Sequence, residues 1–192
     1  MKAKTEGLIN YIELNLGLIS TGWSHLIESS GDSFQIARFN NKPMTGAVTF
    51  STLGISKSVL PQYKGKSIRQ ELIFCCNRPF ANWDIPELLM VVGEELLTHK
   101  KAFMRGQVLG HAGPLFPKST LDALYCSVPV YFPESLHEYK DTDPITVFIW
   151  LIPITKEEAR FIEERGWDDF EDLLVKRDPD LLDLKRSSII DS

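Results

Sequence analysis

The sequence is poor in the features from which disulfide frameworks and membrane spans are built. It has three cysteines, an odd number, and Cys75 and Cys76 are adjacent, so a bridge between them would close a strained ring. Its longest apolar run, Ile145–Ile154, is far shorter than the roughly 20 residues that a membrane-spanning helix requires. The apolar residues after Lys2 and Lys4 are interrupted by polar ones, so no signal-peptide core forms. We therefore expect a cytoplasmic protein that has no disulfide framework and does not bind a membrane.

The chain also lacks an excess of positive charge. It has 21 Lys and Arg against 26 Asp and Glu, which makes the formal net charge -5. A protein of this charge would release no net counterions on binding a phosphate backbone, so its long-range field disfavours a polyanion. We therefore expect no direct contact with nucleic acid.

Motifs for metal, nucleophile and phosphate chemistry are missing as well. Neighbours on a strand point to opposite faces, so Cys75 and Cys76 cannot chelate one ion together, and the histidines lie far apart in the chain. Gly54-Ile-Ser and Gly31-Asp-Ser lack the second glycine of a nucleophile elbow. Gly65-Lys-Ser lacks the earlier glycine of a phosphate-binding loop. These absences predict a protein without a metal, a cofactor or catalytic residues.

One turn has a composition that suits a ligand. In the segment Gly106–Pro114, His111 lies between Gly110 and Gly113. Glycine lets a backbone approach a ligand closely, and histidine titrates near neutral pH. A turn histidine with a purely structural hydrogen bond is the more ordinary interpretation. A small-molecule-binding or enzymatic domain that uses this turn is therefore an alternative hypothesis.

Acidic residues gather near the C-terminus. On surface helices such residues commonly form a solvated face, which Lys156, Arg160 and Arg165 would support at helical spacings. The functional alternative is a patch that steers toward, and pairs with, a basic groove such as that of a nuclease. The candidate partner-binding residues are Glu163, Glu164, Asp168, Asp169, Glu171 and Asp172.

The hydrophobic periodicity predicts an α+β domain. Helices are expected over residues 5–16, from Asp84 as N-cap to about 101, from the Thr155 capping box to 165, and from Trp167 onward. Strands are expected over residues 23–27, 34–39, 47–51, 71–76, 107–111, 124–132 and 145–154, with 71–76 at the centre because it is almost wholly apolar. This order favours a mixed, mainly antiparallel sheet flanked by helices.

The same pattern indicates one domain with short additions at each end. We expect an amphipathic N-terminal helix within residues 1–20 and the α+β domain over residues 21–176. Residues 177–192 are expected to form a charged tail that is frayed at its end.

Two ordered stretches resemble the core signature of the suppressor-of-fused domain. They are Val48-Thr-Phe-Ser-Thr-Leu-Gly-Ile-Ser and Arg69-Gln-Glu-Leu-Ile-Phe. The segment Gly106–Pro114, which we call the glycine turn, and the strand Ile149-Trp-Leu-Ile-Pro-Ile-Thr fit the same pattern. The resemblance therefore extends from about residue 21 to 175. Ile55 stands where the family commonly has leucine. The chain is expected to be too short for the additional C-terminal lobe of the animal proteins, so their groove-binding mode is not carried over.

This resemblance implies a bacterial, stand-alone version of the domain. Such proteins are similar to immunity proteins and antitoxins of polymorphic toxin systems, some of which neutralise a nuclease toxin. The resemblance thus implies a non-catalytic protein whose partner is a cognate toxin or another protein. A regulatory scaffold for a host protein is the remaining alternative. The oligomeric state and the interface residues stay open.

Overall fold

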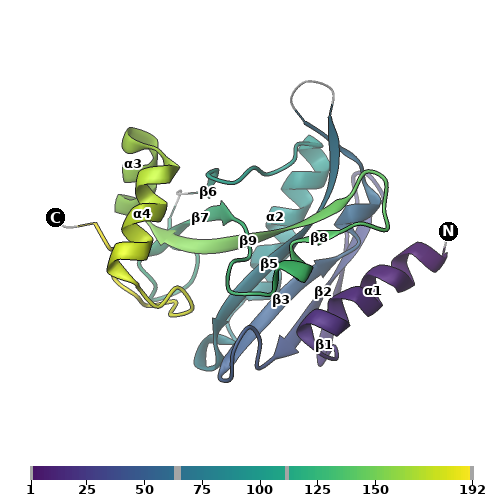
Figure 1. The fold of residues 1–192 in the computed structure, drawn as a ribbon, viewed down its shortest axis with the longest axis horizontal. Coiled ribbons are helices and arrows are strands. Elements are labelled where there is room, and N and C mark those ends of the chain that lie inside the picture. Colours follow the sequence, from purple (N-terminus) through teal and green to yellow (C-terminus); the bar gives the residue numbers. More distant parts are fainter. Residues whose placement is uncertain (1, 63–65, 111–112, 191–192) are drawn as a thin grey trace.

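A computed structural model describes residues 2–62, 66–110 and 113–190, and a single large sheet lies at its centre (Figure 1). The strands that cross the sheet are, in spatial order, β1 (Thr21–Leu26), β2 (Ser33–Asn40), β3 (Ala47–Leu53), β5 (Ser67–Asn77), β9 (Thr146–Thr155), β7 (Leu121–Ser127) and β6 (Val108–Gly110). The short β4 (Leu60–Pro61) pairs with β5, and β8 (Glu138–Tyr139) pairs with β9. Among these strands β5 and β9 run parallel and the other neighbours run antiparallel. The predicted mixed, mainly antiparallel sheet is confirmed.

Helices cover both faces of this sheet (Figure 1). The α-helices are α1 (Lys2–Leu16), α2 (Ile85–His99), α3 (Lys156–Arg165) and α4 (Trp167–Arg177), and short 3-10 turns are η1 (Ile55–Lys57), η3 (Arg78–Phe80) and η4 (Glu134–Leu136). The buried residues of α2 belong to a core on one face, which we call the first core. Those of α1, α3 and α4 belong to the second core, on the opposite face. The α+β architecture follows from these two packed faces.

The first core depends on a close approach of α2 to the sheet. Asp84 stands at the N-cap position, as expected, but its side chain makes no capping hydrogen bond. A Cβ atom on Gly93 would lie 2.6 Å from the ring of Phe34 and 2.9 Å from the Cδ1 of Ile55. The helix ends at His99, and Lys100 follows in the left-handed conformation with a φ of 50°. A glycine at position 93 therefore lets the helix axis come near β2 and η1.

The strand predicted over residues 124–132 is only partly correct. The strand begins earlier, at Leu121, and ends at Ser127. Beyond it the chain turns, with the amide of Val130 donating to the carbonyl of Val128 at 2.8 Å and that of Phe132 donating to the carbonyl of Pro129 at 2.9 Å. Pro129 has no amide hydrogen for a sheet ladder, so the apolar run continues while the strand does not.

The segment after α4, which was expected to be a charged tail, packs on the domain over residues 178–190, and the end of the chain, where fraying was expected, lies outside the described residues. We call residues 178–190 the C-terminal strap. Leu182 and Leu184 are almost fully buried, and the amide of Asn77 donates to the carbonyl of Leu182 at 2.8 Å. The hydroxyl of Ser119 donates to the carbonyl of Leu184 at 2.7 Å. These long-range contacts hold the strap against the domain.

Candidate protein-binding surface

The described residues were compared with the requirements of a metal site, a thiol nucleophile and a membrane span. In residues 2–62, 66–110 and 113–190, no group of three or more His, Cys, Asp or Glu could hold a metal ion. Burial raises the pKa of Cys76 and of Cys126 to about 12 and raises that of Cys75 as well. A thiol nucleophile needs a lowered pKa and access to solvent, which these thiols lack. None of the described helices is long and apolar enough to cross a membrane.

The glycine turn is described on both sides of His111, while His111 itself lies outside the described residues. Gly110 ends β6 opposite Ala123 and has a φ of 87°, and Gly113 follows with a φ of 152°. At the start of the turn Gly106 has a φ of 89°, and a Cβ there would lie 2.5 Å from the ring of Trp167. Gly106 thus has a packing role, and ligand binding by the turn stays a prediction.

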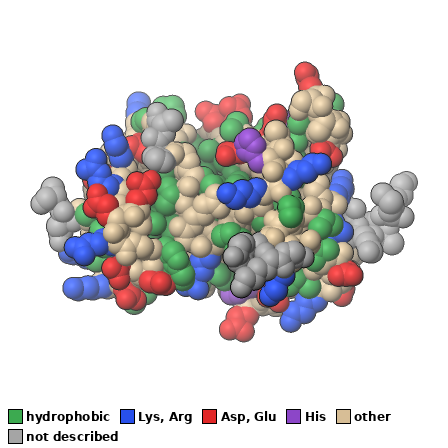
Figure 2. Space-filling view, turned by 90° about the horizontal axis from the view of Figure 1, so that it is seen from above, with side chains coloured by type: hydrophobic (Ala, Val, Ile, Leu, Met, Phe, Trp, Pro, Cys, Tyr) green, Lys and Arg blue, Asp and Glu red, His purple; other side chains and the backbone are tan. Residues whose placement is uncertain are grey.

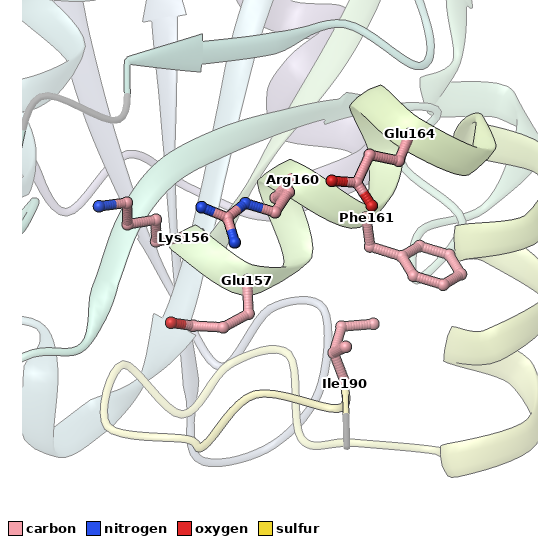
Figure 3. Close-up of a pocket in the computed structure, with 6 residues that line it drawn as sticks. All are labelled: Lys156, Glu157, Arg160, Phe161, Glu164 and Ile190. Carbon is pink, nitrogen blue, oxygen red and sulfur yellow. The ribbon is translucent and has the colours of Figure 1, made fainter. Parts of the chain in front are cut away.

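The acidic candidates lie on two consecutive helices and differ in exposure. The exposed ones are Glu163 and Glu164 on α3 and Asp168, Asp169 and Asp172 on α4. Basic side chains stand between them, and Figure 2 shows both signs intermingled over the end of the molecule that carries α3 and α4. A hollow of about 340 Å³ on α3 is lined by Lys156, Glu157, Arg160, Phe161, Glu164 and Ile190, as Figure 3 shows. This surface is therefore of mixed charge.

Glu171 is different from the other candidates because its side chain is only 22% exposed. Its carboxylate pairs with the guanidinium of Arg105, which also lies 4.7 Å from the ring centroid of Trp167. The hydroxyl of Tyr125 donates to it at 2.7 Å. Partial burial acts to raise the pKa of Glu171, but the hydrogen bonds from Arg105 and Tyr125 outweigh burial and the pKa is lowered.

These contacts make Glu171 an anchor that fastens α4 to β7. Burial and the hydrogen bond to Glu171 raise the pKa of Tyr125, so its hydroxyl keeps the proton that it donates. Sequence reasoning grouped Glu171 with the surface acids because nothing near it in the chain shows that Tyr125 and Arg105 meet it in the fold.

The stretches that carry the family signature converge on one buried carboxylate. Glu71, on β5, accepts hydrogen bonds from the hydroxyls of Thr52 and Ser56, both at 2.6 Å. The amides of Gly54 and Ser56 donate to it at 2.7 and 3.1 Å. Burial raises the pKa of Glu71, and these hydrogen bonds oppose that rise.

The signature thus has a structural reason that sequence reasoning did not assign. Thr52 also accepts a hydrogen bond from the amide of Leu72 at 2.8 Å, which ties β3 to β5. Gly54 has a φ of 114°, a conformation that favours glycine and lets the chain turn back over the carboxylate. The signal available in the sequence was Glu71 itself, an acid at the start of the apolar run predicted as the central strand.

The sequence and the fold both match known proteins. The family model described as suppressor of fused protein matches residues 30–187, which is most of the chain. The chain belongs to the suppressor of fused family. The expectation drawn from the signature stretches is thereby confirmed.

Relatives within the suppressor of fused family and its fold are distant in sequence. Immunity protein YqcF of Bacillus subtilis (strain 168) is 21% identical over 165 residues, which cover 85% of each protein. The crystal structure of a suppressor of fused homolog from Neisseria gonorrhoeae matches with a TM-score of 0.78 at 19% identity and full coverage of both chains. A chain in the Sufu–Fu complex matches with a TM-score of 0.68 at 14% identity, covering 98% of this chain and 91% of that one. The structural matches establish the shared fold.

Proposed function

We propose that this protein is a non-catalytic immunity protein that neutralises a cognate toxin by direct protein–protein contact. The observation that carries the proposal is the relationship, over 85% of both chains, to a protein named as an immunity protein. A structure of the same fold is that of a complex with a second protein, which supports binding as the mode of action. To neutralise the toxin, this protein must then cover or distort the functional site of the toxin.

Co-expression tests this role directly. The protein is produced together with the toxin encoded beside its gene, and cell survival and complex formation are measured. We expect survival and a stable complex that co-purifies, while a toxin from an unrelated locus is neither bound nor neutralised. Failure to bind or protect against any neighbouring toxin would contradict the immunity role.

The charged surface of α3 and α4 supports a second, finer part of the proposal. Exposed carboxylates raise the association rate with a basic partner through long-range attraction. The test variant neutralises Glu163, Glu164, Asp168 and Asp169 as the amides. We expect association with a basic toxin to slow most at an ionic strength of about 0.01 M, where the Debye length is about 30 Å. The control neutralises four other exposed acids, which are Glu28 and Asp32 in the turn between β1 and β2 and Glu87 and Glu95 on α2.

If the neutralised variant associates as fast as the wild type at low salt, the acids of α3 and α4 are only a solvated face. If it slows no more than the control, net charge alone explains the rate. A larger loss than in the control supports the acidic residues as part of the binding surface.

A further inference from the structure

A groove of about 230 Å³ lies beside α4 and β9. Figure 1 shows α4 next to the end of β9. Its apolar lining includes Val130, Tyr131, Trp150, Ile152, Leu174 and Val175. Pockets for drug-sized molecules usually have about 300–1,000 Å³, so a groove of this size suits a single side chain of a larger partner. The walls come from β9, from the turn after β7, and from α4.

One observation in this groove indicates an absent occupant, and a second provides a reporter for it. Val130 and Val175 are 64% and 84% exposed, so the groove presents large apolar side chains to water. Trp150 is only 1% exposed, and its Nε1 has no hydrogen-bond acceptor among the described residues. This nitrogen is closed to solvent, so the indole senses an occupant of the groove through its ring and not through a hydrogen bond. A large apolar side chain in the groove would cover the two exposed valines.

The charged residues of the groove indicate the sign of the charge that a bound segment should carry. Arg105 and Glu171 line the groove but pair with each other. Asp178 lines it as well, at the C-terminal end of α4, and its carboxylate adds to burial in raising the pKa of Tyr131. The charge that the groove offers beyond the internal pair is therefore negative, which is complementary to Lys or Arg.

We propose that this groove binds a segment of a partner protein in which one large apolar side chain is flanked by Lys or Arg. The apolar side chain covers Val130 and Val175 beside the indole of Trp150, and the cation lies near Asp178. This inference rests on the proposed function, because it names the chemistry of the surface that such a partner presents. Buried aromatic or aliphatic anchors of this kind dominate many protein interfaces.

The indole N–H of Trp150 is a direct reporter for the experiment. The chain has four tryptophans, so the ¹⁵N-labelled protein gives few indole signals, and Trp150→Phe assigns the relevant one. The probe is the blocked tripeptide acetyl-Lys-Trp-Lys-amide, compared with acetyl-Glu-Trp-Glu-amide and acetyl-Lys-Ser-Lys-amide. We expect the basic tryptophan peptide to move the Trp150 signal. The signal of Trp83, which packs on the first core, should stay in place.

Matched variants separate the apolar contribution to peptide binding from the electrostatic one. Val175→Ser and Asp178→Asn should each weaken binding of the basic tryptophan peptide at least about threefold. Val91→Ser is the apolar control because Val91 is 66% exposed on α2, and Asp172→Asn is the charge control outside the groove. Equal shifts with all three peptides, no shift at all, or no effect of the two groove variants would overturn the proposal.

Experiments with the cognate toxin distinguish a failure of the groove proposal from a failure of the proposed function. If the wild type protects cells and the Val175→Ser/Asp178→Asn double variant protects and binds equally well, the immunity role stands and the groove proposal is wrong. If no neighbouring toxin is bound, the immunity role fails, while the peptide titration still decides whether the groove binds an apolar side chain flanked by basic residues.

Discussion

Glu71 and Glu158 are completely buried carboxylates, and each is surrounded by donors from distant parts of the chain. The Glu71 carboxylate accepts hydrogen bonds from two hydroxyls and two amides at the end of β3 and in the turn after it. The Glu158 carboxylate accepts hydrogen bonds from both terminal nitrogens of Arg186, at 2.6 and 2.7 Å, and from the amide of Ile189 at 3.0 Å. At the residue scale these two side chains therefore connect segments that hydrophobic contacts alone would leave loosely aligned.

Replacing Glu71 by Gln should destabilise the protein. The NH2 group of the Gln side chain donates and cannot accept, so the donors that met the oxygen it replaces, from Thr52 or from Gly54 and Ser56, lose their partner, at about 1–3 kcal/mol each. We expect the free energy of unfolding to fall by about 3 kcal/mol, measured by urea denaturation with far-UV circular dichroism. Glu28→Gln, on an exposed turn, is the control and should change stability by about 0.5 kcal/mol or less. A loss as small as that of the control would show that the network is not stabilising.

Replacing Glu171 by Gln should have an effect that depends on pH. The folded-state pKa of Glu171 lies below the ordinary value of 4.5, so the folded protein takes up this proton less readily than the unfolded chain. The resulting stabilisation is complete above pH 4.5 and is lost as the pH falls through the folded-state pKa. Because Arg105 is half-exposed, we expect a difference of about 1 kcal/mol at pH 7. Urea denaturation of both proteins from pH 7 to pH 3 measures it, and a difference that does not shrink in acid would contradict the prediction.

At the scale of elements, the C-terminal strap connects parts of the fold that are far apart in sequence. It contacts the end of β5 through Asn77, the loop before β7 through Ser119, and α3 through Glu158. Its Arg186 side chain also donates to the carbonyl of Pro153 at 3.0 Å. The strap therefore covers the join between the sheet and α3, and its contacts consist of hydrogen bonds and an ion pair as well as buried leucines.

Replacing Arg186 by Met should loosen this strap and destabilise the whole protein. The change leaves the Glu158 carboxylate buried without its cation, which typically costs about 3–5 kcal/mol. The double variant Glu158→Gln/Arg186→Met removes the charge as well, so we expect it to recover part of the loss. Urea denaturation of the three proteins measures both effects. A single variant as stable as the wild type, or a double variant less stable than the single one, would contradict this account.

The elements show which parts of the fold local sequence can predict. Gly17 and the Thr155 capping box are local signals, and both mark helix boundaries in the structure. The helix expected from Trp167 onward is α4, and its Phe170 is fully buried. The strap was not foreseen, because Arg186 is held by Glu158 and the carbonyl of Pro153, which lie 28 and 33 residues away in the chain. For the same reason, Glu171 could not be separated from the surface acids until its contact with Tyr125 was seen.

At the scale of the whole molecule, the two cores share the strands that lie between them. Along β5, Leu72 and Phe74 belong to the first core, whereas Ile73 and Cys75 belong to the second. The strand β9 alternates in the same way. Each of these strands is buried on both faces, as is usual for a parallel pair at the centre of a sheet. Loss of either layer would expose one full face of the same strands to water.

This sharing predicts that both cores unfold in one cooperative transition. Trp83 packs against the first core and Trp150 lies in the second, so each indole reports on one face of the sheet. Two single-tryptophan variants, with the other indoles replaced by Phe, give a separate fluorescence probe for each core. Within each variant we expect the fluorescence midpoint in urea to coincide with that of far-UV circular dichroism, as two-state unfolding requires. If one layer could leave while β5 and β9 stayed paired, its tryptophan would report a lower midpoint than the backbone signal, and the cores would be independent.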